Sequence, residues 1–99
     1  MTGQKIRKIM CCCGNGVGTS LVMQMTIEEA LEILGKTGIE VLFGTLTDAS
    51  EEKADLFVVS EELEDSMGEL PVIGLEDLMD ADEAAEKLKD MLEKIEKEG

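Results

Sequence analysis

The chain has 99 residues, and 23 acidic against nine basic side chains give it a formal net charge of −14, with no histidine. This length predicts one small domain, residues 1–99, built around one core. The acidic balance and an aromatic content of 2% argue against nucleic acid as a partner. The lack of histidine excludes a Ser-His-Asp triad, a Cys-His dyad and a histidine-ligated zinc site within the chain.

The charge is distributed unevenly along the sequence. Residues 1–47 hold four acids and four bases, whereas residues 48–99 hold 19 acids and five lysines. No charged residue lies between Ile9 and Ile27, but glycines and polar side chains interrupt this run. It therefore predicts neither a membrane span nor a signal peptide. We expect a soluble, cytoplasmic protein that does not insert into the membrane.

Four short apolar runs predict the strands of a sheet. They cover residues 5–12, 39–46, 54–60 and 71–75. Between these runs, residues 48–51 resemble a capped helical turn, and residues 60–67 are expected to form a polar loop or a short helix.

The first long helix is predicted over about residues 19–34. Its apolar side chains recur at helical spacing, and Gly35 is placed to end it. Thr26 and Glu29 leave a second interpretation open, because they have the spacing of a capping box and would start the helix later. We prefer one continuous helix from Thr19.

A final helix is predicted to follow Asp80, which has the spacing of a capping box with Glu83. Its apolar residues form a stripe on one face, and glutamates and lysines occupy the other face. Strands that alternate with helices indicate the α/β class. We predict a single small domain with a four-stranded, mainly parallel sheet flanked by helices, Rossmann-like, open and doubly wound.

One segment, Cys13 to Ser20 (CGNGVGTS), carries the chemistry of the chain. It joins the first predicted strand to the first predicted helix, and open parallel sheets bind ligands at the carboxyl ends of their strands. A glycine-rich turn lets successive backbone N–H groups point into one concavity, and a helix N-terminus adds further donors. Thr19 and Ser20 can add hydroxyl donors. The segment predicts an anion cradle sized for a phosphate, with a thiol at its entrance.

The same surroundings favour a reactive thiolate at Cys13. A helix N-terminus lowers the pKa of a cysteine by roughly one to several units, so no histidine is needed. Donors that bind a phosphate would also stabilise a phosphoryl group on the sulfur. Cys11 and Cys12 are expected to pack in the core, where free cysteines behave as small hydrophobic residues.

Three familiar phosphate-site patterns do not fit the spacing of this loop. A P-loop requires a lysine, but the loop ends in Gly18-Thr19-Ser20, and a dinucleotide fingerprint requires a glycine where Thr19 stands. Cysteine phosphatases of the low-molecular-weight type have an arginine at that same position, whereas the only arginine here is Arg7. Without it, dianion binding loses its strongest protein partner.

After an apolar strand, CGNGVGTS resembles the phosphorylation loop of the IIB subunits of bacterial sugar phosphotransferase systems. The ascorbate type is the most similar, and the galactitol type is a neighbour. The likeness extends over nearly the whole chain in length and in the order of elements. It implies that Cys13 accepts a phosphoryl group from a phosphohistidine on a IIA subunit and passes it to a sugar bound by the membrane subunit IIC.

The resemblance also implies the composition of the phosphate loop and the absence of a metal or organic cofactor. The implied phosphate-binding residues are Gly14, Asn15, Gly16, Val17, Gly18, Thr19 and Ser20.

Two other interpretations stay open from the sequence. The chain could be a small phosphatase-like or arsenate-reductase-like cysteine enzyme, which would act without partners. It could also be a non-catalytic α/β module in which the glycines only form a turn, and in which Thr19 and Ser20 only cap a helix. The neutrality of residues 1–47 suggests that partners approach the loop end and not the acidic C-terminal face.

Overall fold

The computed structural model describes residues 6–13, 17–45, 52–68 and 70–98, and the turn predicted over residues 48–51 lies outside them. The described strands form one sheet in the order β2-β1-β3-β4, and every neighbouring pair is parallel. The strands are β1 (Lys8–Cys13), β2 (Glu40–Thr45), β3 (Leu56–Ser60) and β4 (Val72–Leu75). The helices are α1 (Val17–Leu34), the 3₁₀ helix η2 (Glu61–Met67) and α2 (Ala81–Glu98).

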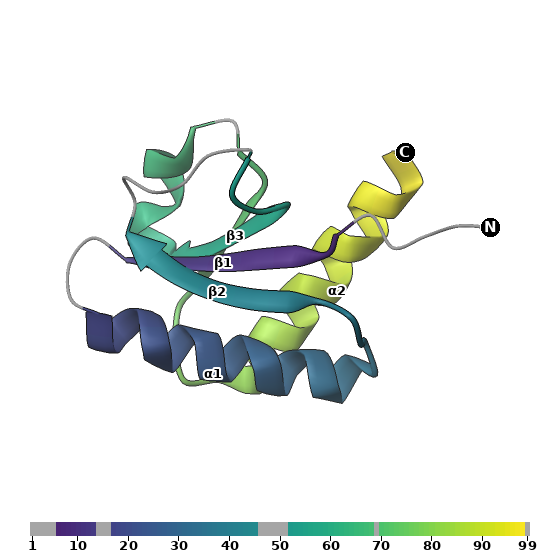
Figure 1. Cartoon of the computed structure of the whole chain (residues 1–99), viewed down its shortest axis with the longest axis horizontal. Helices are drawn as coiled ribbons and strands as arrows, with labels where there is room; N and C mark the ends of the chain where they lie inside the picture. The colour runs from purple at the N-terminus through teal and green to yellow at the C-terminus, as the bar shows by residue number, and fades with distance from the viewer. Residues whose placement is uncertain (1–5, 14–16, 46–51, 69, 99) are drawn as a thin grey trace.

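The sheet lies between two layers (Figure 1). Helices α1 and α2 cover one face and pack against each other, while η2 lies against the other face beside β3 and β4. Along β3, Leu56 and Val58 belong to the helix-side core, whereas Phe57 and Val59 belong to the opposite core. This alternation is the two-residue period of a strand that is buried on both faces. The predicted α/β class and four-stranded parallel sheet are confirmed.

Helix α1 begins at Val17, two residues before the predicted start, and continues without a break to Leu34. Thr26 does not cap a later helix, because its buried hydroxyl donates a 2.6 Å hydrogen bond to the carbonyl oxygen of Leu78. The end of the helix is as predicted. Gly35 has a φ of +71°, and its N–H bonds back to the carbonyl of Glu32, as the glycine closing a Schellman motif does.

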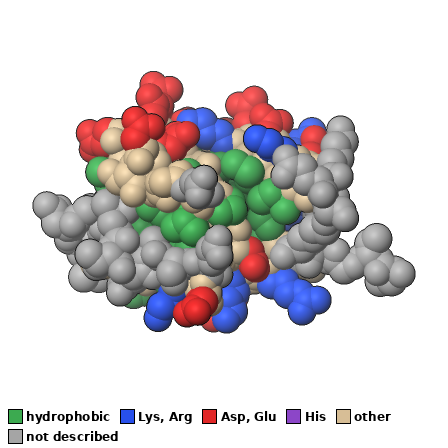
Figure 2. Space-filling model, turned by 90° about the horizontal axis from the view of Figure 1, so that it is seen from above, with side chains coloured by type: hydrophobic (Ala, Val, Ile, Leu, Met, Phe, Trp, Pro, Cys, Tyr) green, Lys and Arg blue, Asp and Glu red, His purple; other side chains and the backbone are tan. Residues whose placement is uncertain are grey.

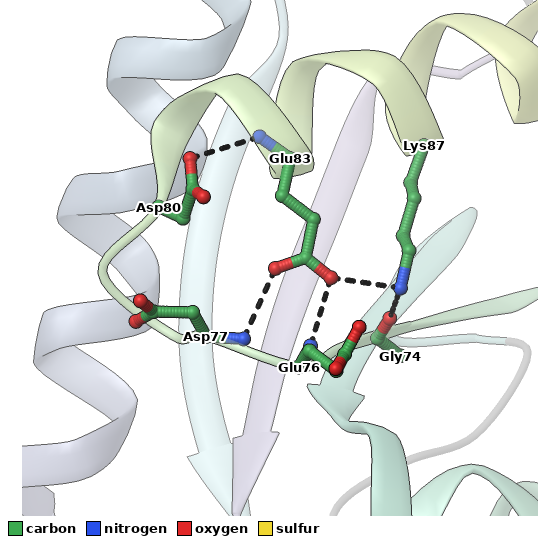
Figure 3. Close-up of polar contacts among 6 residues, drawn as sticks. All are labelled: Gly74, Glu76, Asp77, Asp80, Glu83 and Lys87. Carbon is green, nitrogen blue, oxygen red and sulfur yellow. Dashed lines mark hydrogen bonds and ion pairs between the residues drawn. The ribbon is translucent and has the colours of Figure 1, made fainter.

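Only one of the two hydrogen bonds of the predicted capping box forms at the start of α2. Asp80 Oδ1 accepts a 3.1 Å hydrogen bond from the N–H of Glu83, so Asp80 is the N-cap. The Glu83 carboxylate does not return to Asp80. It accepts hydrogen bonds from the N–H groups of Glu76 (2.9 Å) and Asp77 (3.0 Å), directly after β4 (Figure 3). Lys87 pairs with Glu83 at 2.9 Å and also donates to the carbonyl of Gly74.

These contacts form a polar clamp, Glu83 and Lys87 with the backbone of residues 74–77, which fixes α2 to the end of β4. The pKa of Glu83 is lowered: burial opposes this shift, but the two N–H donors and Lys87 outweigh it. The pKa of Lys87 is raised, chiefly by its hydrogen bond to Glu83. On the opposite face of the sheet, η2 packs tightly against the same strand end. A Cβ added at Gly74 would lie only 2.9 Å from Glu61 Cα, so a larger residue would not fit there. Both layers therefore hold the carboxyl end of β4 in place.

Candidate functional site

The carboxyl ends of the four strands are level with one another. Cys13, the last residue of β1, pairs with Thr45, the last residue of β2. In the pairing of β1 with β3, Cys11 lies opposite Val58. The same register, continued by two residues, brings Cys13 level with Ser60, the last residue of β3. Ser60 in turn pairs with Leu75 at the end of β4. The backbone of Cys13 therefore lies in the middle of one edge of the sheet.

The same edge contains the point at which the direction of winding reverses. From β1 the chain crosses by α1 to β2 on one side, whereas from β3 it crosses by η2 to β4 on the other side. The two crossovers cover opposite faces of the sheet, as right-handed connections in opposite directions require. Open α/β sheets bind their ligands at such a switch point. The end of β1 is where the sequence predicted a site.

The first turn of α1 adds backbone donors beside this strand end. The helix runs from Val17, so the N–H groups of residues 17–19 have no acceptor within the helix itself. They lie at the positive end of the helix dipole (Figure 1). Thr19 and Ser20 are inside this first turn and are not N-caps, so the interpretation of these two residues as simple caps is wrong. A start at Val17 brings these N–H groups two residues closer to Cys13 in the sequence than a start at Thr19 would.

Other parts of the predicted site lie outside the described residues. They are the whole of Gly14, Asn15 and Gly16, and the side chains of Cys13, Val17, Thr19 and Ser20. The backbone of Cys13 and of residues 17–20 is described: Cys13 is the last residue of β1, and residues 17–20 form the first turn of α1.

Cys11 and Cys12 are fully buried, as predicted, on opposite faces of β1. Burial raises the pKa of the Cys11 thiol far above its usual range, and the neighbouring Cys12 and Glu28 act in the same direction. A protonated, buried thiol is neither a nucleophile nor a metal ligand. Cys11 is therefore a core residue.

Acidic side chains border this edge of the sheet, which the sequence did not predict. We call them the acidic rim, and all are exposed: Glu61, Glu62, Glu64, Asp65, Glu76 and Asp77. They follow β3 and β4, and parallel pairing brings these strand ends to the edge that holds Cys13. Figure 2 shows acidic side chains gathered at the upper left, toward the end of the molecule where the strands terminate. The division between neutral and acidic halves of the sequence is therefore not a division in space.

Exposed apolar side chains form a second feature near the site. We call them the apolar surface: Leu21, Val22, Met25, Phe43 and Met79. Met25 and Met79 are 68% and 76% exposed, respectively. Three of these residues lie in the half of α1 that follows the candidate site, within the uncharged run of the sequence. The uncharged run was therefore the one feature of the sequence that could have indicated this exposed apolar surface.

Two further findings limit what the described residues can do. Among them, no cluster of three or more histidine, cysteine or carboxylate side chains is arranged to hold a metal ion. Within the same parts of the chain, no helix combines the length and apolar character that crossing a membrane requires.

The fold and the position of Cys13 define a small parallel α/β domain with a cysteine at the switch point of its sheet and a helix N-terminus beside it, a place where such sheets bind ligands. Comparison with known proteins makes this specific. The family model described as "PTS system, Lactose/Cellobiose specific IIB subunit" matches residues 8–90. The "Ascorbate-specific PTS system EIIB component" of Mycoplasma pneumoniae is 31% identical over 88 residues, which cover 85% of this chain and 93% of that protein.

The chain therefore belongs to the IIB family of sugar phosphotransferase systems. The predicted family resemblance is confirmed. Members of this family are phosphoryl carriers that act with IIA and IIC partners.

Proposed function

We propose that this protein is the phosphoryl carrier of an ascorbate-type system, and that Cys13 is the residue that is phosphorylated. The observation that carries the proposal is the place of Cys13 in the fold. It ends the central strand β1 at the switch point of the sheet, and the first turn of α1 begins at Val17, four residues later in the sequence. No other described cysteine is available, since Cys11 and Cys12 are fully buried.

In the first step the Cys13 thiolate attacks the phosphorus of a phosphohistidine on IIA. A sulfur–phosphorus bond forms, the nitrogen–phosphorus bond breaks, and the leaving imidazole takes up a proton. Backbone N–H groups of residues 14–20, including those at the start of α1 that have no acceptor within the helix, bind the phosphoryl oxygens. Electrostatic stabilisation of this kind replaces the arginine that cysteine phosphatases use.

In the second step a hydroxyl group of the sugar, bound by the membrane subunit IIC, attacks the same phosphorus. An oxygen–phosphorus bond forms, the sulfur–phosphorus bond breaks, and Cys13 returns as a thiolate. The proton of the hydroxyl group goes to a base on IIC, because this chain has no histidine to accept it. A thiolate stabilised by a helix N-terminus is a good leaving group.

The sugar class rests on the relative, which is named as ascorbate-specific. The matching family model carries the lactose and cellobiose name, so a direct comparison of substrates is informative. We expect vesicles that hold the IIC partner to phosphorylate ascorbate, and not cellobiose, when supplied with the phosphorylated carrier.

Incubation with radiolabelled phospho-IIA tests the assignment of Cys13. The wild-type protein should gain a label that iodine releases, as expected of a sulfur–phosphorus bond, and Cys13→Ser should reduce this iodine-sensitive label to background. Cys11→Ala, which changes a buried thiol on the same strand, is the matched control and should keep the label. Unchanged labelling of Cys13→Ser would refute the assignment. Hydrolysis of an aryl phosphate by the protein alone would instead favour a phosphatase.

A further inference from the structure

The apolar surface and the acidic rim meet beside α1. The hydrogen bond from Thr26 to the carbonyl of Leu78 fixes the segment after β4 against the middle of the helix. Met79, the next residue, is exposed there, and its N–H bonds to the Asp77 carboxylate at 3.0 Å. Apolar Met79 and acidic Asp77 are therefore neighbours in a segment that is held in place.

The rim continues from this point along the edge of the sheet. Glu76 lines one shallow pocket together with Leu75, Ser60, Glu61 and Glu62, at the ends of β3 and β4. Three carboxylates around one pocket make it unsuited to an anion. Exposed residues are thus apolar on the first half of α1 and at Met79, and acidic from Asp77 to the ends of β3 and β4.

The apolar part of this surface has no partner within the described chain. A helix with apolar residues on all sides is normally buried, yet Leu21 and Met25 of α1 face solvent. Contiguous exposed apolar residues with a polar border mark an interaction site. This one adjoins the end of β1, so whatever reaches Cys13 comes close to it.

The charge of the rim selects between the two partners of the proposed function, on which this inference rests. The cytoplasmic loops of membrane proteins carry an excess of Lys and Arg. Such loops complement an acidic border, and complementary charges speed encounter and fix orientation. Anionic lipid would repel the same border, so the membrane protein and not the bilayer is the matching surface.

We propose that the apolar surface, bordered by the acidic rim, is the docking site for the cytoplasmic face of the membrane subunit. In this arrangement the rim faces Lys and Arg side chains of the cytoplasmic loops, and α1 contacts apolar side chains between them. Residues Leu21 and Met25 supply short-range contact, while Glu61 and Glu76 supply steering. The proposal gives the rim this role in the encounter with the membrane subunit, and the comparison with the IIA step tests it.

A charge-neutralised variant tests the rim: Glu61→Gln, Glu62→Gln and Glu76→Gln together. Its matched control removes the same charge from the exposed face of α2: Glu86→Gln, Asp90→Asn and Glu93→Gln. Two rates are measured for each full-length protein, phosphorylation by phospho-IIA and transfer from the phosphorylated protein to sugar in inside-out vesicles that contain the membrane subunit. Both are measured at low and at high salt.

We expect the rim variant to lose about tenfold in the sugar-transfer rate at low salt, and to lose most of the salt dependence of that rate. Its phosphorylation by phospho-IIA should match that of the wild type, and the α2 control should match in both steps. Equal slowing of both steps, or equal slowing by the α2 control, would overturn the proposal. The double variant Met25→Ser and Met79→Ser should slow sugar transfer while its salt dependence remains.

Co-sedimentation of the unphosphorylated protein with vesicles separates this proposal from the proposed function, since it needs no phosphoryl transfer. Binding that depends on the membrane subunit and weakens in the rim variant supports the docking site even if Cys13 is not the carrier. Binding to vesicles that lack the membrane subunit, at the same level, would refute it.

Discussion

Helices α1 and α2 have the same length, 18 residues, and lie on the same face of the sheet, but their outer faces differ. Both bury an apolar inner face. In α1 this face is Met23, Ile27, Ala30 and Leu31, and in α2 it is Ala84, Ala85, Leu88 and Leu92. Outside, α2 presents charged side chains along its length, whereas the first half of α1 presents Leu21, Val22 and Met25. The inner faces serve the fold, whereas the outer face of α1 is part of the docking site that we propose.

The largest effect expected from this comparison concerns the inner faces, which should be equivalent. Ile27→Ala in α1 and Leu88→Ala in α2 each remove a fully buried side chain, and each should lower the free energy of unfolding by about 2–5 kcal/mol. Urea unfolding measures both, with exposed Glu86→Ala as a control expected to stay within about 0.5 kcal/mol of the wild type. A small cost at Ile27 alone would mean that α1 does not belong to the core in the same way.

A smaller loss of stability is expected when the polar clamp of α2 is weakened. Glu83→Gln weakens the clamp that holds α2 to β4 and should cost about 1–2 kcal/mol at neutral pH, because a charged acceptor of two N–H groups is replaced by a neutral one. Glu86→Gln, on the exposed face of the same helix, should cost almost nothing.

The clamp also predicts a pH dependence. The pKa of Glu83 is lower in the folded state, so its stabilisation is present above the ordinary value of 4.5 and is lost as the pH falls through the folded value. The raised pKa of Lys87 has the opposite sign, and its contribution is lost only above the ordinary 10.5. The stability difference between wild type and Glu83→Gln should therefore shrink in acid. A difference that stays constant from pH 7 to pH 3 would show that the charge of Glu83 does not stabilise the fold.

The sequence was sufficient for the elements that depend on local pattern. Four apolar runs gave the strands, and Gly35 gave the end of α1, because a left-handed closing residue is a property of a few neighbouring positions. The position of Cys13 was also predictable. A glycine-rich turn after an apolar strand indicates a strand end, and in a parallel sheet strand ends are where ligands bind.

The features that the sequence did not predict depend on contacts between residues far apart in the chain. Thr26 and Glu29 have a local capping pattern, but the hydroxyl of Thr26 bonds to Leu78, which lies 52 residues away. The capping pattern of Glu83 was likewise overridden by the backbone after β4, which offers two N–H groups at once. The acidic rim was missed for the same reason, because it arises when parallel pairing brings the ends of β3 and β4 level with the end of β1.

The smallest expected effect gives the sharpest comparison, since one substitution is made in both helices. Met25 of α1 is 68% exposed, whereas Met91 of α2 packs against the core. Glutamine has nearly the length and the helix propensity of methionine, so helix formation itself should hardly change. Met25→Gln should shift the free energy of unfolding by less than about 0.5 kcal/mol, while Met91→Gln should cost about 1 kcal/mol or more, because it buries a polar amide. Urea unfolding measures both, and a cost at Met25 equal to that at Met91 would mean that the chain itself buries this side chain. If Met25→Gln leaves stability unchanged and slows transfer to the sugar, the apolar outer face of α1 serves the partner alone.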